Sequence, residues 1–503
     1  MLSKSISLAI TGIEAKIVEV EVDIIKGLPN FIIVGLPDST IKESKDRIRS
    51  AIENSGFEFP PHNFIVNLAP AGFRKQGANF DLPIAISILK ATEQICFETD
   101  TIPLVGELSL DGRIKPVKGI ISMTIAIQNK YNSIIVPYEN RYEAGAIKTI
   151  DVFPAKNLNH VVDILNNLPP AFKEEALTVI EELPLDFAEV RGQETAKRAL
   201  EIAAAGHHNV LLYGPPGSGK TMLAKRIPTI LPTLTYEQST ETTMIHSAAG
   251  KLAAEYGLIT KPPFRSPHHT SSDIALVGGG QNPTVGEISL SHNGILFLDE
   301  FVEFKSNAIQ ALRQPLEDNK ITVSRAAGQY TFPADFMLIA STNPCGCGYL
   351  FDKDIRCICS SKKISHYYQK IAGPILDRID IEVLLDRISF KELTETSASE
   401  SSETIKKRIE KARQIQIDRL GRTAYNSRMS NKEIKKFCIL EKDTANILEN
   451  AVKIMHLSAR SYFKVLKTAR TIADLSGSEI ICKNHLLEAI SYKNLAKNYV
   501  DFM

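Results

Sequence analysis

The octapeptide Gly214-Pro215-Pro216-Gly217-Ser218-Gly219-Lys220-Thr221 directly follows the apolar run 209–213. A strand, a glycine-rich turn and a helix start form a phosphate-binding loop (P-loop), because glycines let backbone N–H groups converge on phosphate oxygens. In such a loop the lysine reaches the β- and γ-phosphates and the threonine hydroxyl binds Mg²⁺. The positive end of the helix dipole adds to the same anion site. The octapeptide therefore predicts a site for a nucleoside triphosphate, with ATP and Mg²⁺ as cofactors.

A second apolar strand, 295–298, ends in Asp299 and Glu300. In a parallel sheet both carboxylates would lie at the carboxyl edge, where ligands bind. We expect Asp299 to hold Mg²⁺ through water and Glu300 to polarise the attacking water. Together with the P-loop, this pair predicts hydrolysis as well as binding.

Two more polar residues each have two interpretations. Asn343 follows the apolar run 336–340, and it either hydrogen-bonds the lytic water or γ-phosphate or caps a turn. Arg378 stands between Asp377 and Asp380. It either acts as an arginine finger for a neighbouring subunit or forms an internal salt-bridge set, and the pattern alone favours the salt bridges.

Four of the seven cysteines fall within positions 345–359: Cys345, Cys347, Cys357 and Cys359. Four thiolates can bind tetrahedral Zn²⁺, and such a site would be structural because no coordination position stays open. The alternative is four reduced thiols in a loop, since this C-x-C spacing is tighter than the usual C-x₂-C. We expect the other three cysteines, at 96, 438 and 482, to be buried.

Composition predicts an ordinary globular protein. The chain has 503 residues, 44% of them hydrophobic, and a formal net charge of +1, which suits two to four domains and excludes a largely disordered protein. The net charge argues neither for nor against a nucleic-acid partner. No apolar run approaches the ~18 residues of a membrane span, and charges from Glu14 onward do not suit a signal peptide. We therefore expect a cytoplasmic protein without a membrane partner.

The pattern along the chain predicts an α/β multidomain protein. Residues 1–168 mix strand-like runs (15–22, 31–34, 64–68 and 133–136) with helical patterns near 40–55 and 81–92, as in an α+β domain. Residues 169–185 look like a linker. In residues 186–386 strands alternate with helices, as parallel sheets require, and residues 387–503 are helical.

Taken together, these motifs resemble the AAA+ ATPases of the magnesium-chelatase-like branch. Segments 265–270, 276–280 and 286–294 are more similar still to the ComM/YifB family, and the resemblance covers essentially the whole chain. It implies a helix-2 insert over about 262–294, a pre-sensor hairpin near 321–330 and a C-terminal helical lid. It also implies Asn343 as sensor 1, Arg378 as an arginine finger acting in trans and Arg460 as sensor 2. Such proteins work as homo-oligomeric rings, usually hexamers.

Two features of the insert and hairpin have an ordinary alternative. His268 and His269 are adjacent, and adjacent side chains point apart on a strand, so turn or packing roles are favoured over a metal. Arg325, near the hairpin tip, either contacts a phosphate backbone or is a solvated loop arginine.

Segments 72–85 and 106–119 resemble the Lon protease domain, an S5-type α+β fold. A working protease of this kind needs a nucleophilic serine and a lysine with a lowered pKa. The serine position falls near Asn79, and the lysine position falls among Ile121, Ser122 and Met123, where no lysine stands. Peptidase activity is therefore disfavoured, and we expect the domain to serve binding or ring assembly.

The resemblance implies an ATP-driven ring that binds single-stranded or branched DNA, with branch-migration or helicase activity in homologous recombination during natural transformation. The alternatives are an ATP-dependent protein remodeller and a magnesium-chelatase-type motor subunit. Direct support for DNA is limited to scattered basic residues, each of which alone is more simply a solvated surface residue: Arg325, Lys353, Arg356, Lys362 and Lys363.

Overall fold

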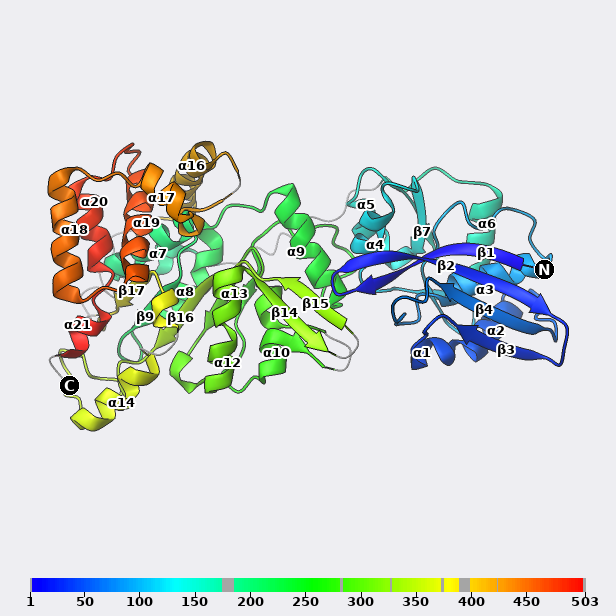
Figure 1. The fold of residues 1–503 in the computed structure, drawn as a ribbon, viewed down its shortest axis with the longest axis horizontal. Helices are drawn as coiled ribbons and strands as arrows, with labels where there is room; N and C mark the ends of the chain where they lie inside the picture. Colours follow the sequence, from blue (N-terminus) through cyan, green and yellow to red (C-terminus); the bar gives the residue numbers. More distant parts are fainter. Residues whose placement is uncertain are drawn as a thin grey trace.

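The structure is a computed structural model that describes residues 2–173, 185–280, 284–325, 328–371, 375–388, 399–422 and 424–500. The molecule is elongated, and its parts follow one another along the long axis (Figure 1). An N-terminal α+β part lies at one end, a parallel-sheet part lies in the middle, and a helical part lies at the other end. None of the described helices is both long and apolar enough to cross a membrane.

The N-terminal part is built on a four-stranded sheet in the order β1-β2-β4-β3. β1 (Leu2–Thr11), β2 (Glu14–Ile25) and β4 (Asn63–Ala69) are antiparallel, and β3 (Asn30–Val34) joins β4 in parallel. The other elements are α1 (Ser39–Lys42), α2 (Ser44–Asn54), α3 (Asp81–Ala91), β5 (Glu107–Leu108), β6 (Ile114–Lys115), α4 (Ile120–Ile127), β7 (Ser133–Pro137), α5 (Arg141–Gly145), β8 (Asp151–Ala155) and α6 (Leu158–Asn166). The four predicted strands and both predicted helical regions are confirmed.

The sequence analysis did not predict strand β1. Its alternating serines suggest a solvated face, but Ser3, Ser5 and Ser7 are all buried. Ser5 donates its hydroxyl hydrogen to the carbonyl of Pro83 at 3.0 Å and accepts from Ser87 at 2.7 Å. Partners on α3 therefore satisfy the buried hydroxyl of Ser5, whereas the buried hydroxyls of Ser3 and Ser7 have no hydrogen-bond partner in the described structure.

The middle part contains a five-stranded parallel sheet in the order β10-β13-β16-β9-β17. Its strands are β9 (Val210–Tyr213), β10 (Phe264–Arg265), β13 (Ile295–Leu298), β16 (Met337–Thr342) and β17 (Ile381–Leu384). Every residue of β9, β13 and β16 is buried, because helices cover both faces of a parallel sheet and each strand must be apolar throughout. The helices are α7 (Glu194–Gly206), α8 (Lys220–Ile230), α9 (Tyr236–Ala248), α12 (Ser306–Ala311), α13 (Arg313–Asp318) and α14 (Ser361–Ile371).

This strand order determines where the functional residues lie. β13, β16 and β9 are neighbours, so the residues that follow them meet at one carboxyl edge. β17 pairs with β9 in parallel, Ile381 opposite Val210. Residues that precede β17, Arg378 among them, therefore lie at the opposite, amino edge.

The region between α9 and β13 matches the predicted insert in part. It contains α10 (Asp273–Val277), the pair β11 (Gly278–Gly279) and β12 (Thr284–Val285), and α11 (Glu287–Leu290). Its first strand, β10, extends the main sheet, which the sequence analysis did not predict. The predicted hairpin is present as β14 (Lys320–Arg325) paired with β15 (Gly328–Pro333), and residues 326–327 between them lie outside the described residues.

The C-terminal part is helical, as predicted. It contains α16 (Ser402–Leu420), α17 (Asn431–Phe437), α18 (Lys442–Met455), α19 (Ala459–Leu475), α20 (Lys483–Ser491) and α21 (Leu495–Val500). Its core is continuous with one face of the parallel sheet, through a single cluster that runs from Phe187 to Tyr492. The last helix returns to the sheet, where the Leu495 N–H donates to Glu382 of β17 at 3.0 Å.

Candidate nucleotide-binding and hydrolysis site

The P-loop requires glycine at three positions for different reasons. Gly217 and Gly219 have φ of +77° and +90°, a region that residues with a Cβ rarely adopt. At Gly214 a Cβ would lie 2.4 Å from the carbonyl oxygen of Leu385. The loop is therefore held tightly between β9 and the residues that follow β17.

Lys220 lies inside the loop with only neutral oxygens as hydrogen-bond partners. Its Nζ donates to the carbonyls of Gly214 and Pro215 at 2.8 and 2.9 Å, to the Ser218 hydroxyl at 3.5 Å and to Asn343 Oδ1 at 3.2 Å. Burial lowers the pKa of Lys220 to about 8, against a smaller raising effect of Asp299. A buried cation surrounded by dipoles fits an anionic phosphate, which would restore its charge balance.

Asp299 links helix α8 to strand β16. Its carboxylate accepts from the Thr221 hydroxyl at 2.8 Å and from the Ser341 hydroxyl on β16. Glu300 follows with φ of +52°, an uncommon conformation for a residue with a side chain. Carboxylate and hydroxyl oxygens are the donors that Mg²⁺ prefers, so Thr221 and Asp299 fit this ion.

A cavity of about 330 Å³ adjoins this site. It is lined by His269, Glu300, Glu303, Thr342, Asn343 and Tyr367. His269 Nδ1 lies 3.5 Å from Glu300 Oε2, and Glu300 itself is 60% exposed. The cavity therefore brings together the two residues predicted to handle the attacking water, Glu300 and Asn343.

The interpretation of His268 and His269 as turn or packing residues agrees with the structure, because residues 269–270 form a turn and the His269 ring packs edge to face against Phe304 at 6.4 Å. Residues 266–272 form no strand, and the two imidazole rings lie 4.1 Å apart instead of pointing in opposite directions. His268 bonds the Thr270 hydroxyl at 2.8 Å, which leaves His269 facing Glu300. The insert thus contributes a side chain to this cavity.

Arg378 and Arg460 meet at a place remote from the P-loop of their own chain. Arg378 Nη2 lies 2.6 Å from Glu317 Oε1, and Arg460 Nη2 lies 2.9 Å from the same oxygen. They line a cavity of about 440 Å³ on the amino edge of the sheet. Other charged side chains around it are Asp377, Asp380, Arg428, Lys464 and Lys467. Asp380 is engaged by Lys464 at 3.1 Å, and Arg378 forms an ion pair with Glu317.

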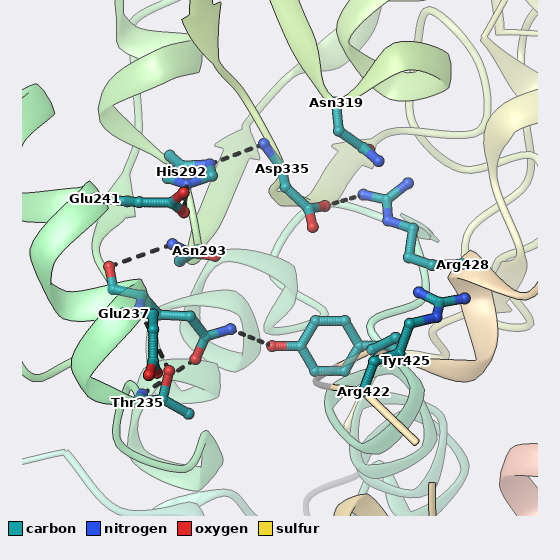
Figure 2. Close-up of a pocket in the computed structure, with 12 residues that line it drawn as sticks. Thr235, Glu237, Glu241, His292, Asn293, Asn319, Asp335, Arg422, Tyr425 and Arg428 are labelled. Atoms are coloured by element: carbon teal, nitrogen blue, oxygen red, sulfur yellow. Dashed lines mark hydrogen bonds and ion pairs between the residues drawn. The ribbon is translucent and has the colours of Figure 1, made fainter. Parts of the chain in front are cut away.

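A second cavity, of about 350 Å³, adjoins this one between α9 and the lid. Figure 2 shows Asp335 facing Arg428, with His292 and Glu241 to one side and Tyr425 below. His292 Nδ1 accepts from the Asp335 N–H at 3.0 Å, and Gln238 of α9 donates to the Tyr425 hydroxyl at 3.1 Å. These contacts attach the lid to the amino edge of the sheet, so the lid position is linked to α9.

The four clustered cysteines converge in the loop that follows Asn343. Their sulfurs all lie within 4.8 Å of one another. The expectation that the remaining cysteines are buried holds for Cys438 and is wrong for Cys96 and Cys482, which are exposed. Both of these stand beside surface turns, where a single small side chain need not pack.

The residues at the protease positions of the N-terminal part bond to backbone. Asn79 Nδ2 donates to the Leu8 carbonyl at 2.6 Å, and the Ser122 hydroxyl donates to the Ile13 carbonyl at 2.6 Å. Both side chains are buried. The Ser122 hydroxyl and the Asn79 amide are therefore held by backbone carbonyls, and neither is placed as a reactive group that a basic side chain activates.

The sequence did not predict the roles of Gln193, Ser341 and Glu317, or the position of His269 beside Glu300. Gln193 joins the P-loop to the end of β17, by donating to the carbonyls of Ser218 at 3.1 Å and Asp386 at 2.7 Å. Ser341, His269 and Glu317 bond the predicted residues as described above. Ser341 lies two positions before Asn343 and His269 lies within the segment 265–270, so closeness in sequence to a predicted site was a usable signal. No local sequence feature marked Glu317.

Comparison with known proteins gives matches along most of the chain. Family models match residues 186–393 (magnesium chelatase, subunit ChlI), 20–140 (subunit ChlI of Mg-chelatase) and 399–493 (magnesium chelatase, subunit ChlI C-terminal). The competence protein ComM of Haemophilus influenzae is 40% identical over 499 residues, 98% of this chain and 97% of that protein. YifB of Escherichia coli is 42% identical over 488 residues, 96% of each chain. Lon protease 2 of Bacillus subtilis is 27% identical over 182 residues, 32% of this chain and 33% of that protein.

Proposed function

The chain belongs to the ComM/YifB family of magnesium-chelatase-like AAA+ proteins, and on this premise we propose that it is an ATP-hydrolysing ring motor that acts on DNA. The activity we propose is branch migration or unwinding of recombination intermediates during natural transformation, in the cytoplasm. The DNA part is supported by relationship to a protein named for competence. The ATPase part is supported by the geometry of the site, and above all by the meeting of Lys220, Asp299 and Asn343 at one sheet edge.

We assign the chemistry as follows. Lys220 and the P-loop N–H groups bind the phosphates, and Thr221 and Asp299 hold Mg²⁺, which neutralises charge on the transferred phosphoryl group when bound. Glu300 takes up the proton of the attacking water. Asn343, which accepts from Lys220 in this structure, orients that water or the γ-phosphate. His269 positions Glu300 from the opposite wall of the cavity.

We propose that Arg378 and Arg460 complete a neighbouring subunit's site. Both lie at the amino edge of the sheet. Arg378 is bonded there by Asn209, which directly precedes β9, and the P-loop begins five positions later, at Gly214. At about 3.3 Å per residue this separates them from their own P-loop by ~16 Å. Two arginines that act on a bound phosphate from there require a head-to-tail ring, for which we propose six copies.

We propose that the N-terminal part has the Lon-type fold without its activity. The support is the resemblance to Lon protease 2 over a third of that protein and the backbone bonds of Asn79 and Ser122. We also propose that the four clustered cysteines hold one structural Zn²⁺, with domain boundaries near residues 168, 186 and 387.

The proposal is tested by steady-state ATP hydrolysis of the purified protein with no DNA, single-stranded DNA or a four-way junction. Glu300→Gln serves as the blank, because it retains the binding residues and lacks the proton acceptor. We expect DNA to stimulate hydrolysis and added salt to weaken the stimulation steeply, as phosphate contacts require. Hydrolysis that is indifferent to DNA would favour a protein remodeller, and absence of hydrolysis would refute the ATPase assignment.

A further inference from the structure

Three of the four cysteine sulfurs in the loop between β16 and α14 are spaced as the thiolates of a tetrahedral metal site would be, and the fourth lies within 4.8 Å of them. The Cys345 sulfur lies 3.4 Å from that of Cys347 and 3.7 Å from that of Cys357, and the latter two are 3.5 Å apart. Four thiolates at ~2.3 Å from a zinc ion are separated by about 3.8 Å along each edge of the tetrahedron. The observed spacings therefore already match a common ligand to within a few tenths of an ångström.

Backbone donors surround these sulfurs as they would surround thiolates. The N–H of Cys359 lies 3.4 Å from the Cys357 sulfur, and the N–H groups of Tyr349 and Ile358 bond the Cys347 sulfur. Hydrogen bonds to the charged form favour it. Thiolates this close repel one another, so a divalent cation of sulfur preference, above all Zn²⁺, is the ligand that fits.

The loop has no regular secondary structure of its own. Residues 343–360 contain turns and irregular backbone but no helix or strand. Contacts with other elements hold part of it, since Leu350 is buried and the Tyr499 hydroxyl donates to the Pro344 carbonyl. A metal ion bound by all four cysteines would add a cross-link within the loop itself.

The loop also forms one wall of the nucleotide site. Gly348, with φ of +89°, lies so close to the P-loop that a Cβ there would be 2.7 Å from Pro216 Cδ. The ring of Phe351 meets that of Tyr213, the last residue of β9, edge to face at 6.1 Å. Asn343 precedes the first cysteine by two positions. The cysteine loop therefore touches the P-loop at Pro216 and the preceding strand at Tyr213, and it carries the residue that bonds Lys220.

We propose that a Zn²⁺ held by these four cysteines fixes the loop 343–359 against the P-loop, so that nucleotide affinity depends on the metal. This inference rests on the nucleotide site and the zinc site of the proposed function. It adds that the metal has a positioning role in nucleotide binding and is not merely a distant structural ion.

Metal binding is tested first, on the full-length protein. We expect one zinc per chain by elemental analysis, and replacement by Co²⁺ should give the visible spectrum of a tetrahedral thiolate site. Cys347→Ser should lose the metal, while Cys482→Ser, which removes an exposed cysteine elsewhere, should retain it. Protein without zinc that also fails to give the Co²⁺ spectrum would overturn the metal assignment.

Coupling to the nucleotide is tested by the affinity for a fluorescent ATP analogue. Gly348→Ala should retain zinc and raise the Kd by on the order of tenfold, a loss of ~1.4 kcal/mol of binding free energy. Gly346→Ala is the matched control, because it lies in the same loop with nothing within 4 Å of the added Cβ. If Cys347→Ser does not fold, the comparison of Gly348→Ala with Gly346→Ala still tests whether the loop position affects nucleotide affinity.

Removal of zinc from the wild-type protein by a chelator should raise the same Kd, and return of zinc should restore it. An unchanged Kd in the zinc-free protein and in Gly348→Ala would overturn the coupling while leaving the ATPase proposal intact. Failure of the zinc-loaded wild-type protein to bind the analogue would instead refute the proposed nucleotide site.

Discussion

Arg378 is expected to serve the neighbouring subunit's nucleotide, and two inactive variants can test this together. Arg378→Ala removes the finger and keeps Glu300, whereas Glu300→Gln keeps the finger and removes the proton acceptor. The Arg378 carbonyl is bonded by Asn209 Nδ2 at 2.9 Å, at the start of β9, and the P-loop begins at Gly214 beyond the other end of that strand. The ~16 Å that this rise implies is longer than an arginine side chain, so Arg378 cannot reach its own γ-phosphate.

The size of the effect follows from this arrangement. Loss of an arginine finger lowers kcat by ~10³–10⁵, so each variant alone should be nearly inactive. In a head-to-tail ring, each site takes Glu300 from one subunit and Arg378 from the next. In an equimolar mixture half of the sites keep their glutamate and half of those face an intact arginine, so about a quarter of the wild-type turnover should return.

The assay is ATP turnover of the two variants after mixing and reassembly. A matched control mixes Arg378→Ala with the double variant Arg378→Ala/Glu300→Gln. Because the double variant also lacks the arginine finger, this mixture should recover no ATP turnover. If the first mixture shows only the sum of its separate components, although the rings exchange subunits, the reasoning from the sheet edges is refuted.

Three further outcomes are expected. Arg460→Ala should show the same complementation with Glu300→Gln, because Arg460 shares the Glu317 oxygen with Arg378; rescue absent for this residue alone would place it in its own subunit's site. ATP affinity, measured by titration at several pH values, should be constant below pH 8 and fall by up to about tenfold per unit above it, since Lys220 must be protonated and burial lowers its pKa to about 8; Lys220→Ala should lack this decline. His269→Ala should lower kcat on the order of tenfold at unchanged KM, with His269→Gln closer to wild type; a changed KM would indicate a role in binding instead.

The nucleotide site was largely predictable because its residues belong to local motifs. The P-loop needs its glycines within eight positions, and two of them do adopt the left-handed backbone that the motif requires. Asp299 follows a four-residue strand whose burial is uniform. Such a run is typical of an internal strand of a parallel sheet, and together with the P-loop it predicted the edge at which the carboxylates lie.

The rest depends on contacts between residues far apart in the chain. Glu317 and Arg460 are 143 positions apart (460 − 317), and no local pattern marks an exposed glutamate as the partner of two arginines. The position of His269 depends on the two-residue strand β10, which is too short for periodicity to detect. Pairing of β10 with β13 brings the insert to the catalytic edge, and only the tertiary structure reveals this.

Ile121 and Ser122, which lie where the resemblance to Lon would place a lysine, take part in the junction between the N-terminal part and the parallel-sheet part. The Ile121 N–H donates to the buried Glu143 carboxylate at 2.9 Å, and Ser247, at the end of α9, donates its hydroxyl hydrogen to the same group. Burial raises the pKa of Glu143, so these donors offset the cost of holding a carboxylate there. Ser122 holds the carbonyl of Ile13 at 2.6 Å, and Ile13 packs in the hydrophobic cluster of the parallel-sheet part. A lysine in place of Ser122 would lose the bond to Ile13 and would put an ammonium group at a buried position, where desolvation is costly. Residues 121 and 122 thus help to join the two parts of the chain, a structural role that needs no catalytic lysine.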